Sequence, residues 1–194
     1  MRKDFRVENL REEIEKIYDD FEKEQKRKKQ EAQTHEPQDC YMIFNGTNLG
    51  LVKAGKLVDN LDAMSGYQAY QAKKYQDVVD RGPIPEGKYD ALQKERQTIT
   101  PFDAGVGLVA GALNINYGKW KGSLPTWGMR RVWIHPDDKT NTYGRDNFSI
   151  HGGMSKGSRG CIDIPWQTDK LSTYLDGCAD EKVPLYVRYK RDYW

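Results

Sequence analysis

The chain has 194 residues, with 31 basic and 29 acidic side chains and a formal net charge of +2 at pH 7. This length suits one domain with an appendage and argues against a two-domain dinucleotide-binding enzyme. The near balance of charge argues against the strongly positive field on which nucleic-acid binding normally depends. The 5 Trp, 12 Tyr and 5 Phe residues provide enough bulk for a packed interior, so disorder throughout is excluded.

The first 36 residues differ in character from the rest, because they hold 10 basic and 11 acidic side chains. From Phe5 to about Lys29, apolar side chains recur at steps of three and four, which predicts one amphipathic helix. The polar stretch 30–39, which contains Pro37, is typical of a linker. We therefore divide the chain into a charged helix and linker, 1–36, and a main domain, 37–194. The helix either packs along one stripe or binds a partner, and both interpretations stay open.

No stretch approaches the roughly 18 apolar residues that a membrane span requires. The N-terminus also lacks the apolar core of a cleavable secretory signal peptide, so we expect neither a membrane span nor conventional export. The three cysteines, Cys40, Cys161 and Cys178, are too few for a disulfide scaffold, and none forms the close pair typical of structural zinc. At least one thiol is therefore unpaired within the monomer.

Beyond the linker, short apolar runs separated by turn residues predict a mainly β domain. Asn45-Gly46 and Ala54-Gly55 mark two hairpin turns, and the segment 82–87 forms a rigid turn before a strand. A helix is expected over 166–175, whereas 93–110 and 118–129 give no distinct pattern. No glycine loop of the Walker or dinucleotide type is present, so phosphate binding has no support. The expected strands are 41–44, 48–52, 56–61, 88–92, 111–117, 131–135, 147–151 and 183–189.

The segment from Phe148 to Ile164 carries the chemistry. An alternating strand ends at His151, and a nine-residue loop with four glycines then leads to Cys161. Glycine at this density, against a usual frequency of about 7%, indicates backbone at positive φ or close to a bound group. A cysteine attacks carbonyls as its thiolate and needs a neighbouring base or cation. We therefore predict Cys161 as nucleophile and His151 as base, with amides around Gly160 and Cys161 facing the developing oxyanion.

Three cationic side chains, Lys156, Arg159 and Arg145, are predicted to favour the thiolate and to bind a carboxylate-bearing substrate. The ring of His151 needs a partner that orients it, and the backbone carbonyl of Gly152 is one candidate. A zinc site from the side chains of His151, Cys161, Asp163 and His135 is disfavoured because the ligand spacing is not compact. We interpret Asp163 as a structural hydrogen-bond acceptor and expect no metal or organic cofactor. The tryptophans Trp120, Trp127 and Trp133 either wall the cleft or, as we favour, pack in the core.

His151-Gly152 followed by Ser158-Arg159-Gly160-Cys161 resembles the motif of the L,D-transpeptidase (YkuD-like) family. The short gap and the Cys-Ile-Asp ending are most similar to the branch found among type VI secretion effectors that attack peptidoglycan. Weaker similarities lie at 44–46, 63–66, 82–89 and 145–148, so the resemblance covers about three quarters of the chain. It implies a β-sandwich or barrel with one or two short helices, in which Cys161 is the nucleophile, His151 the base, and Ser158 and Gly160 shape the loop.

Two residues depart from the more familiar members of that family. Those members carry histidine in the second position of Ser-x-Gly-Cys and arginine soon after the cysteine, whereas this chain has Arg159 and Asp163. The departures bear on substrate preference more than on the nucleophilic chemistry. The charged helix over 5–29 is not shared with the family, and it is a candidate contact for an adaptor of the secretion apparatus.

The resemblance implies an antibacterial enzyme whose Cys161 is acylated by the tetrapeptide stem of peptidoglycan. It implies L,D-carboxypeptidase hydrolysis, or L,D-transpeptidase exchange with a D-amino acid, in the periplasm of a target cell reached by type VI secretion, and a cognate immunity protein as partner. In that oxidising compartment Cys40 and Cys178 either pair or remain buried thiols. Two other functions stay open: a non-catalytic peptidoglycan-binding module, and a Cys-His peptidase acting on protein.

Overall fold

The computed structural model describes residues 39–100, 102–103, 105–106, 109, 126–154 and 157–189. The predicted N-terminal helix and linker, and the strand expected over 111–117, lie outside these residues. The described part is mainly β, as the sequence predicted, and its one fully described α-helix is α4 (Thr168–Asp176). A single 3₁₀ turn, η1 (Lys73–Tyr75), interrupts the long connection between the third and fourth strands.

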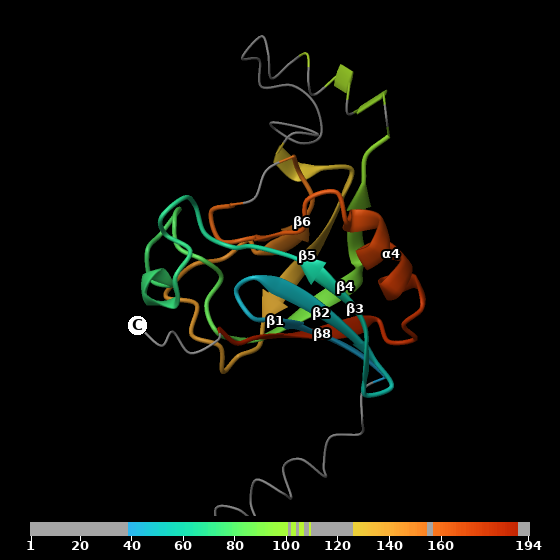
Figure 1. Ribbon diagram of the computed structural model, residues 1–194, viewed down its shortest axis with the longest axis horizontal. Coiled ribbons are helices and arrows are strands. Elements are labelled where there is room, and N and C mark those ends of the chain that lie inside the picture. Colours follow the sequence, from blue (N-terminus) through green and yellow to red (C-terminus); the bar gives the residue numbers. More distant parts are fainter. Residues whose placement is uncertain are drawn as a thin grey trace, which may run out of the picture. The chain divides into compact units, whose positions relative to one another are not determined.

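Within the described residues, eight strands form one sheet in the order β3-β2-β1-β8-β4-β5-β6-β7 (Figure 1). Neighbouring strands are antiparallel except for β1 with β8 and β6 with β7, which are parallel. The sheet curls, and α4 lies beside β4 and β5 (Figure 1). The strand bounds are β1 (Cys40–Phe44), β2 (Asn48–Lys53), β3 (Lys56–Asp62), β4 (Gly87–Thr98), β5 (Arg130–Pro136), β6 (Ser149–His151), β7 (Ile162–Asp163) and β8 (Lys182–Val187).

The meander β1-β2-β3 forms where the sequence predicts it, and its first turn is held by a side chain. The Asn45 carboxamide oxygen accepts hydrogen bonds from the backbone N–H groups of Thr47 and Asn48, at 3.0 and 2.9 Å. The prediction for β4 was too short, because the strand continues past residue 92 to Thr98. Its pairing with β5 shifts register between Ala91 and Arg96, which breaks the period-two alternation that the sequence would otherwise display.

The two edges of the sheet meet next to β7. The backbone N–H of Met64 donates to the carbonyl of Asp163 at 3.0 Å, and the N–H of Asp163 donates back to the Met64 carbonyl at 2.8 Å. Met64 is the second residue after β3, and β3 and β7 are the first and last strands of the sheet. This bridge therefore closes the curled sheet on itself and fixes the two-residue strand β7 between β6 and Met64.

The core fills the inside of the curled sheet and is sealed on one side by α4. The helix contributes Leu171, Tyr174 and Leu175, all buried. The Tyr174 hydroxyl lies 2.9 and 2.7 Å from the carbonyl oxygens of Tyr41 and Val52, so the helix is bonded to the meander as well as packed on it. The fully buried side chains with the largest volumes include Tyr89, Phe44, Met42, Leu49, Leu51, Leu61, Ile84, Ile134, Ile150, Ile162, Ile164 and Leu175.

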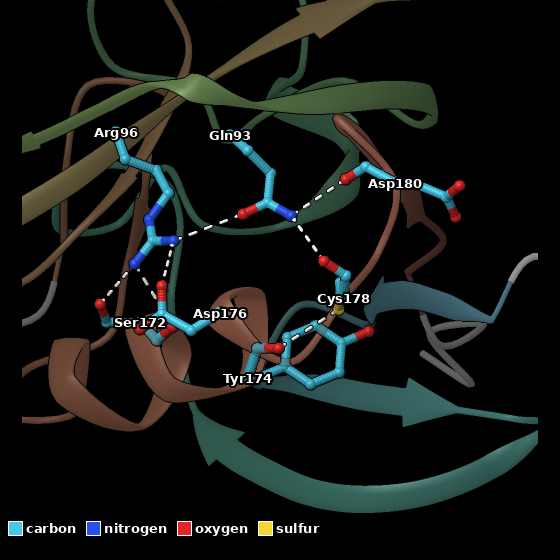
Figure 2. A network of polar contacts seen from close by, with 7 residues as sticks. All are labelled: Gln93, Arg96, Ser172, Tyr174, Asp176, Cys178 and Asp180. Atoms are coloured by element: carbon cyan, nitrogen blue, oxygen red, sulfur yellow. Dashed lines mark hydrogen bonds and ion pairs between the residues drawn. The ribbon is translucent and has the colours of Figure 1, made fainter.

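A disulfide joins Cys40, at the start of β1, to Cys178, in the turn after α4, so these two cysteines pair. Figure 2 shows the polar network around it. The Gln93 side-chain amide donates to the carbonyls of Cys178 and Asp180, at 3.1 and 2.9 Å. The Arg96 guanidinium donates to the Asp176 carboxylate and the Ser172 hydroxyl, each at 2.6 Å. The irregular part of β4 is therefore bonded to the end of α4.

We predict that this disulfide contributes substantially to stability, because it closes a loop with a sequence separation of 138 residues. A Cys40→Ser/Cys178→Ser variant should lose about 2–5 kcal/mol in free energy of unfolding, measured by urea denaturation at neutral pH. Reductant should lower the stability of the wild type and of a Cys161→Ala control, but not that of the double variant. Equal unfolding midpoints for wild type and double variant would contradict the prediction.

Candidate active site

The site forms on one face of three neighbouring strands, β5, β6 and β7. Along each strand alternate side chains enter the core, as Val132, Ile150 and Ile162 do. The register pairs Arg131 with His151 and His151 with Asp163, so these three side chains lie in one row across the strands. Ser149, two residues before His151, and Cys161, two residues before Asp163, follow the same alternation. The sequence pattern thus places five polar or reactive side chains on the face opposite the core.

A cleft of about 640 Å³ opens over this face. Four of the predicted site residues, Cys161, His151, Ser158 and Arg159, line it together with Asp163 and Trp127. Arg159 is exposed at the cleft, whereas the predicted Lys156 lies outside the described residues. Of the tryptophans, Trp127 lies in the cleft wall with its ring centroid 4.8 Å from that of His151. Trp120 lies outside the described residues.

Cys161 is the free cysteine among the described residues, and its side chain is half-buried. The Ser149 hydroxyl donates to its sulfur at 3.3 Å, and the thiol itself points to the Asn147 carbonyl at 3.8 Å. Burial raises the pKa of the Cys161 thiol, while hydrogen bonds from Ser149 and the charge of Arg131 act in the opposite direction. The resting side chain is therefore a neutral thiol that needs a base before it can attack.

His151 is 2% exposed, and its orientation is fixed by the backbone. Its Nδ1 lies 2.8 Å from the carbonyl oxygen of Gly152, which can only accept, so Nδ1 carries the proton and Nε2 of the neutral ring carries the lone pair. The candidate orienting group named from the sequence is thus in place. Burial, with a smaller contribution from the nearby charge of Arg131, lowers the pKa of His151 to about 4 against the opposing effect of the hydrogen bond to Gly152, so the ring is neutral at pH 7.

Asp163 faces the lone pair of His151, with its Oδ1 3.2 Å from Nε2. Its Oδ2 accepts a hydrogen bond from the Gly157 N–H at 2.8 Å, which agrees with the structural role inferred from the sequence. Burial raises the pKa of Asp163 to about 7. Among the described residues no hydrogen bond joins Cys161 to His151 directly. The two side chains share the cleft, and Asp163 is the resting partner of the imidazole.

The glycine-rich loop is shaped by Gly160 and Ser158. Gly160 has φ of +116°, and a Cβ at this position would stand 2.3 Å from Nη2 of Arg145, so only glycine fits without displacement. The Ser158 hydroxyl donates to the carbonyl of Cys161 at 2.5 Å. Gly152, at the other end of the loop, donates its N–H to the carbonyl of Trp127 at 3.0 Å. These contacts set the position of the nucleophile without using its side chain.

The predicted substrate-binding residue Arg145 is buried and has another role. Its guanidinium donates to the carbonyls of Gln76, Pro83 and Gly82, at 2.6, 2.7 and 2.8 Å. These hydrogen bonds engage the guanidinium of Arg145 and fix the segment 76–83 beneath the nucleophile loop. The contacts therefore assign Arg145 to supporting the loop in place of binding substrate.

The charge of Arg131, a residue not predicted from the sequence, acts on the thiol and the imidazole. Its guanidinium lies over the rings of Trp127 and Trp133, 5.2 and 4.5 Å from their centroids, and its Nε donates to Gln97 at 2.5 Å. Its charge affects the pKa of both Cys161 and His151. Its place beside the site follows from the register of β5 against β6, which pairs Arg131 with His151, 20 residues further along the chain.

The described residues contain no cluster of three or more His, Cys, Asp and Glu side chains suited to a metal ion. His135, the fourth ligand of the disfavoured zinc site, is exposed and lies 2.6 Å from Glu95 Oε2. In the part of the chain that the structure covers, no helix has the length and apolarity to cross a membrane.

A protein-family model, the Tlde1 domain, matches residues 59–184, about two thirds of the sequence. The chain belongs to the Tlde1 domain family. Members of this family are type VI secretion effectors, so the effector resemblance drawn from the sequence is confirmed. The match contains both strands that carry His151 and Asp163 and the loop between them. A comparison with curated proteins finds no match.

Solved structures similar to this Tlde1 domain include Bd1075 of Bdellovibrio bacteriovorus, with 15% identity and a TM-score of 0.45 over 76% of this chain and 47% of that one. Mycobacterium tuberculosis L,D-transpeptidase 1 has 12% identity and a TM-score of 0.39, over 77% of this chain and 61% of that one. An L,D-transpeptidase from Xylanimonas cellulosilytica has 13% identity and a TM-score of 0.43, over 79% of this chain and 62% of that one. The chain thus spans about half to three fifths of the length of these proteins.

The buried His151–Asp163 pair predicts an unusual pH dependence of stability. The pKa of Asp163 is raised from 3.8 to about 7, so this group alone makes stability fall as pH rises through that window. The pKa of His151 is lowered from 6.5 to about 4, so this group alone makes stability fall as pH drops from 6.5. The two effects oppose each other, and the wild type should show little net dependence from the pair between pH 4.5 and 6.5.

Replacing Asp163 with Asn should expose the histidine contribution. Between pH 6.5 and 4.5, the Asp163→Asn variant should lose about 1–3 kcal/mol more free energy of unfolding than the wild type, measured by urea denaturation at several pH values. Asp138→Asn, at an exposed site, is the control and should follow the wild type. Parallel pH profiles for Asp163→Asn and wild type would show that the two groups do not titrate as described.

Proposed function

We propose that this Tlde1 domain is a cysteine enzyme that acts on the tetrapeptide stems of peptidoglycan, as an L,D-carboxypeptidase or by exchange with a D-amino acid. The observation that carries the proposal is that a half-buried thiol and an oriented, neutral imidazole line the same cleft. Family membership supports an effector role, and the motif resemblance supports this substrate.

The first step transfers the thiol proton to the imidazole. Substrate entry turns the Cys161 thiol from the Asn147 carbonyl toward Nε2 of His151; the S–H bond breaks and an N–H bond forms. The thiolate is stabilised by the Ser149 hydroxyl and the charge of Arg131. The imidazolium lies against Asp163, whose pKa of about 7 makes its carboxylate available near neutral pH. Each new charge therefore has a partner within the cleft.

The thiolate then attacks the carbonyl at the L-centre of the third stem residue. Backbone N–H groups at Gly160 and Cys161 are the proposed donors to the oxyanion. Collapse breaks the C–N bond to the terminal D-alanine, whose amine takes the proton from His151 and leaves a thioester on Cys161. Water resolves the thioester to a tripeptide, and a free D-amino acid resolves it to an exchanged stem. The chemistry proceeds with these side chains and amides alone.

The charges of the cleft suit such a zwitterionic stem. Arg159 offers a cation to the terminal carboxylate, while Asp80 and Asp146 line the same cleft and offer carboxylates to the amine of the diamino acid. A substrate with one charge of each sign satisfies all three groups. A casein-like protein offers no fixed arrangement of this kind, which favours the stem peptide over the alternative of a general Cys-His peptidase.

The proposed setting is the periplasm of a target cell. The Cys40–Cys178 disulfide suits an oxidising compartment, and membership of an effector family supports delivery by type VI secretion. Hydrolysis or exchange would deprive the target wall of crosslinking donors. A producer then needs an immunity protein, for which the Cys161 cleft is the proposed binding site. The charged segment 5–29, for which the sequence predicts a helix, remains the proposed contact for an adaptor of the secretion apparatus.

The direct test follows the loss of alanine from disaccharide-tetrapeptide by mass spectrometry. Cys161→Ala and His151→Ala should each lower turnover by at least about 10²-fold, because one removes the nucleophile and the other the base. His135→Ala, outside the cleft, should retain wild-type turnover, and EDTA should not reduce it. Undiminished turnover by Cys161→Ala would overturn the nucleophile assignment. Binding of the stem by the wild type without turnover would favour the non-catalytic module. Digestion of casein would favour the Cys-His peptidase.

A further inference from the structure

A second hollow of about 320 Å³ lies next to the cleft and takes no part in the proposed chemistry. Its lining includes Gly128 and Gly152, the immediate neighbours of the cleft residues Trp127 and His151. The Gly152 N–H donates to the Trp127 carbonyl at 3.0 Å, so adjacent backbone at 127–128 and 151–152 lines both hollows. A ligand that extends beyond the stem peptide can therefore occupy both.

The hollow is also lined by Trp166, whose exposed side chain contributes little to the packing of the fold. Trp166 is 72% exposed, although a large apolar side chain gains little from a position in water. It is the third residue of a turn closed by the Gln167 N–H donating to the Ile164 carbonyl at 3.1 Å. Its φ is +62°, a conformation that favours glycine or asparagine at this place in a turn. The chain holds a bulky residue in a strained conformation and obtains no burial for it, a combination that points to function.

The rest of the lining combines the apolar side chain of Met129 with several polar side chains. Thr98 and Thr168 contribute hydroxyl groups, and Arg130 and Asp169 form an ion pair at the same place. A flat aromatic face beside hydroxyl, carboxylate and guanidinium groups matches the chemistry of a pyranose ring, whose C–H face stacks on an aromatic ring while its hydroxyls and amide form hydrogen bonds. A purely apolar partner would make no use of these hydroxyl and charged groups.

We propose that the Trp166 hollow is a saccharide subsite that binds an N-acetylated sugar of the peptidoglycan glycan strand. This inference rests on the proposed function for its substrate, and it adds that the enzyme prefers stems that are still attached to sugar. The stem lies in the Cys161 cleft while the sugar stacks on Trp166. Contacts at Trp166, and not the catalytic residues, then determine the preference for glycan-linked over free stems.

The test compares kcat/KM for disaccharide-tetrapeptide and for the free tetrapeptide, using the full chain. The wild type should prefer the glycan-linked substrate, and Trp166→Gly should lower that preference by about fivefold with little effect on the free peptide. Because glycine relieves the positive φ, Trp166→Gly should unfold at no lower urea concentration than the wild type, which separates binding from a structural role. Tyr143→Gly is the matched control, since Tyr143 is also an exposed aromatic residue at positive φ, 56°, and it should change neither quantity.

A second readout does not depend on turnover. Calorimetric titration of the Cys161→Ala protein with a peptide-free N-acetylglucosamine oligosaccharide should give saturable binding that Trp166→Gly abolishes. If neither peptide substrate is turned over, the proposed reaction fails while this titration still decides the subsite. The inference would be overturned if wild type and Trp166→Gly showed equal selectivity, or if no saccharide bound. It would also be overturned if Trp166 bound a protein and no saccharide, and the hollow would then be assigned to a partner surface.

Discussion

The site depends on the backbone bridge between Met64 and Asp163. The strand β7 has only two residues, and its position comes from partners on both sides: β6 in parallel register and the two hydrogen bonds with Met64. Because the bridge joins opposite edges of the sheet, every element between them contributes to placing Asp163, and with it Cys161 two residues earlier. A loop rich in glycine could not hold a nucleophile in place by itself, since its backbone has too much freedom. Closure of the sheet supplies the rigidity that the loop lacks.

The electrostatics of the site follow from burial. His151 and Asp163 are both taken out of water, so each is driven toward its neutral form, with a pKa of about 4 for the histidine and about 7 for the aspartic acid. Cys161 is likewise held as a thiol at rest. This arrangement costs less than burying separated charges. Arg131 supplies a cation from β5, whereas the more familiar L,D-transpeptidases carry an arginine soon after the cysteine, where this chain has Asp163.

The sequence predicts those features that are local. Turn chemistry and alternation locate β1, β2 and β3, and the spacing from His151 to Cys161 identifies two of the residues that the structure brings into one cleft. The features it misses depend on contacts between distant segments. Arg131 joins the site only through the register of β5 with β6, and Arg145 was assigned to substrate because its three backbone acceptors lie more than 60 residues away. The extension of β4 to Thr98 escapes detection because a register shift interrupts its alternation.

The central claim is that Cys161 becomes a covalent acyl carrier. Mixing the enzyme with disaccharide-tetrapeptide, quenching in acid within the first turnover and measuring intact mass tests this claim most directly. We expect a mass gain equal to the disaccharide-tripeptide acyl group, which is the substrate without its terminal alanine, mapped by peptide digestion to Cys161 and absent from Cys161→Ala. Release of alanine with no adduct at any quench time, or an adduct on another residue, would contradict it.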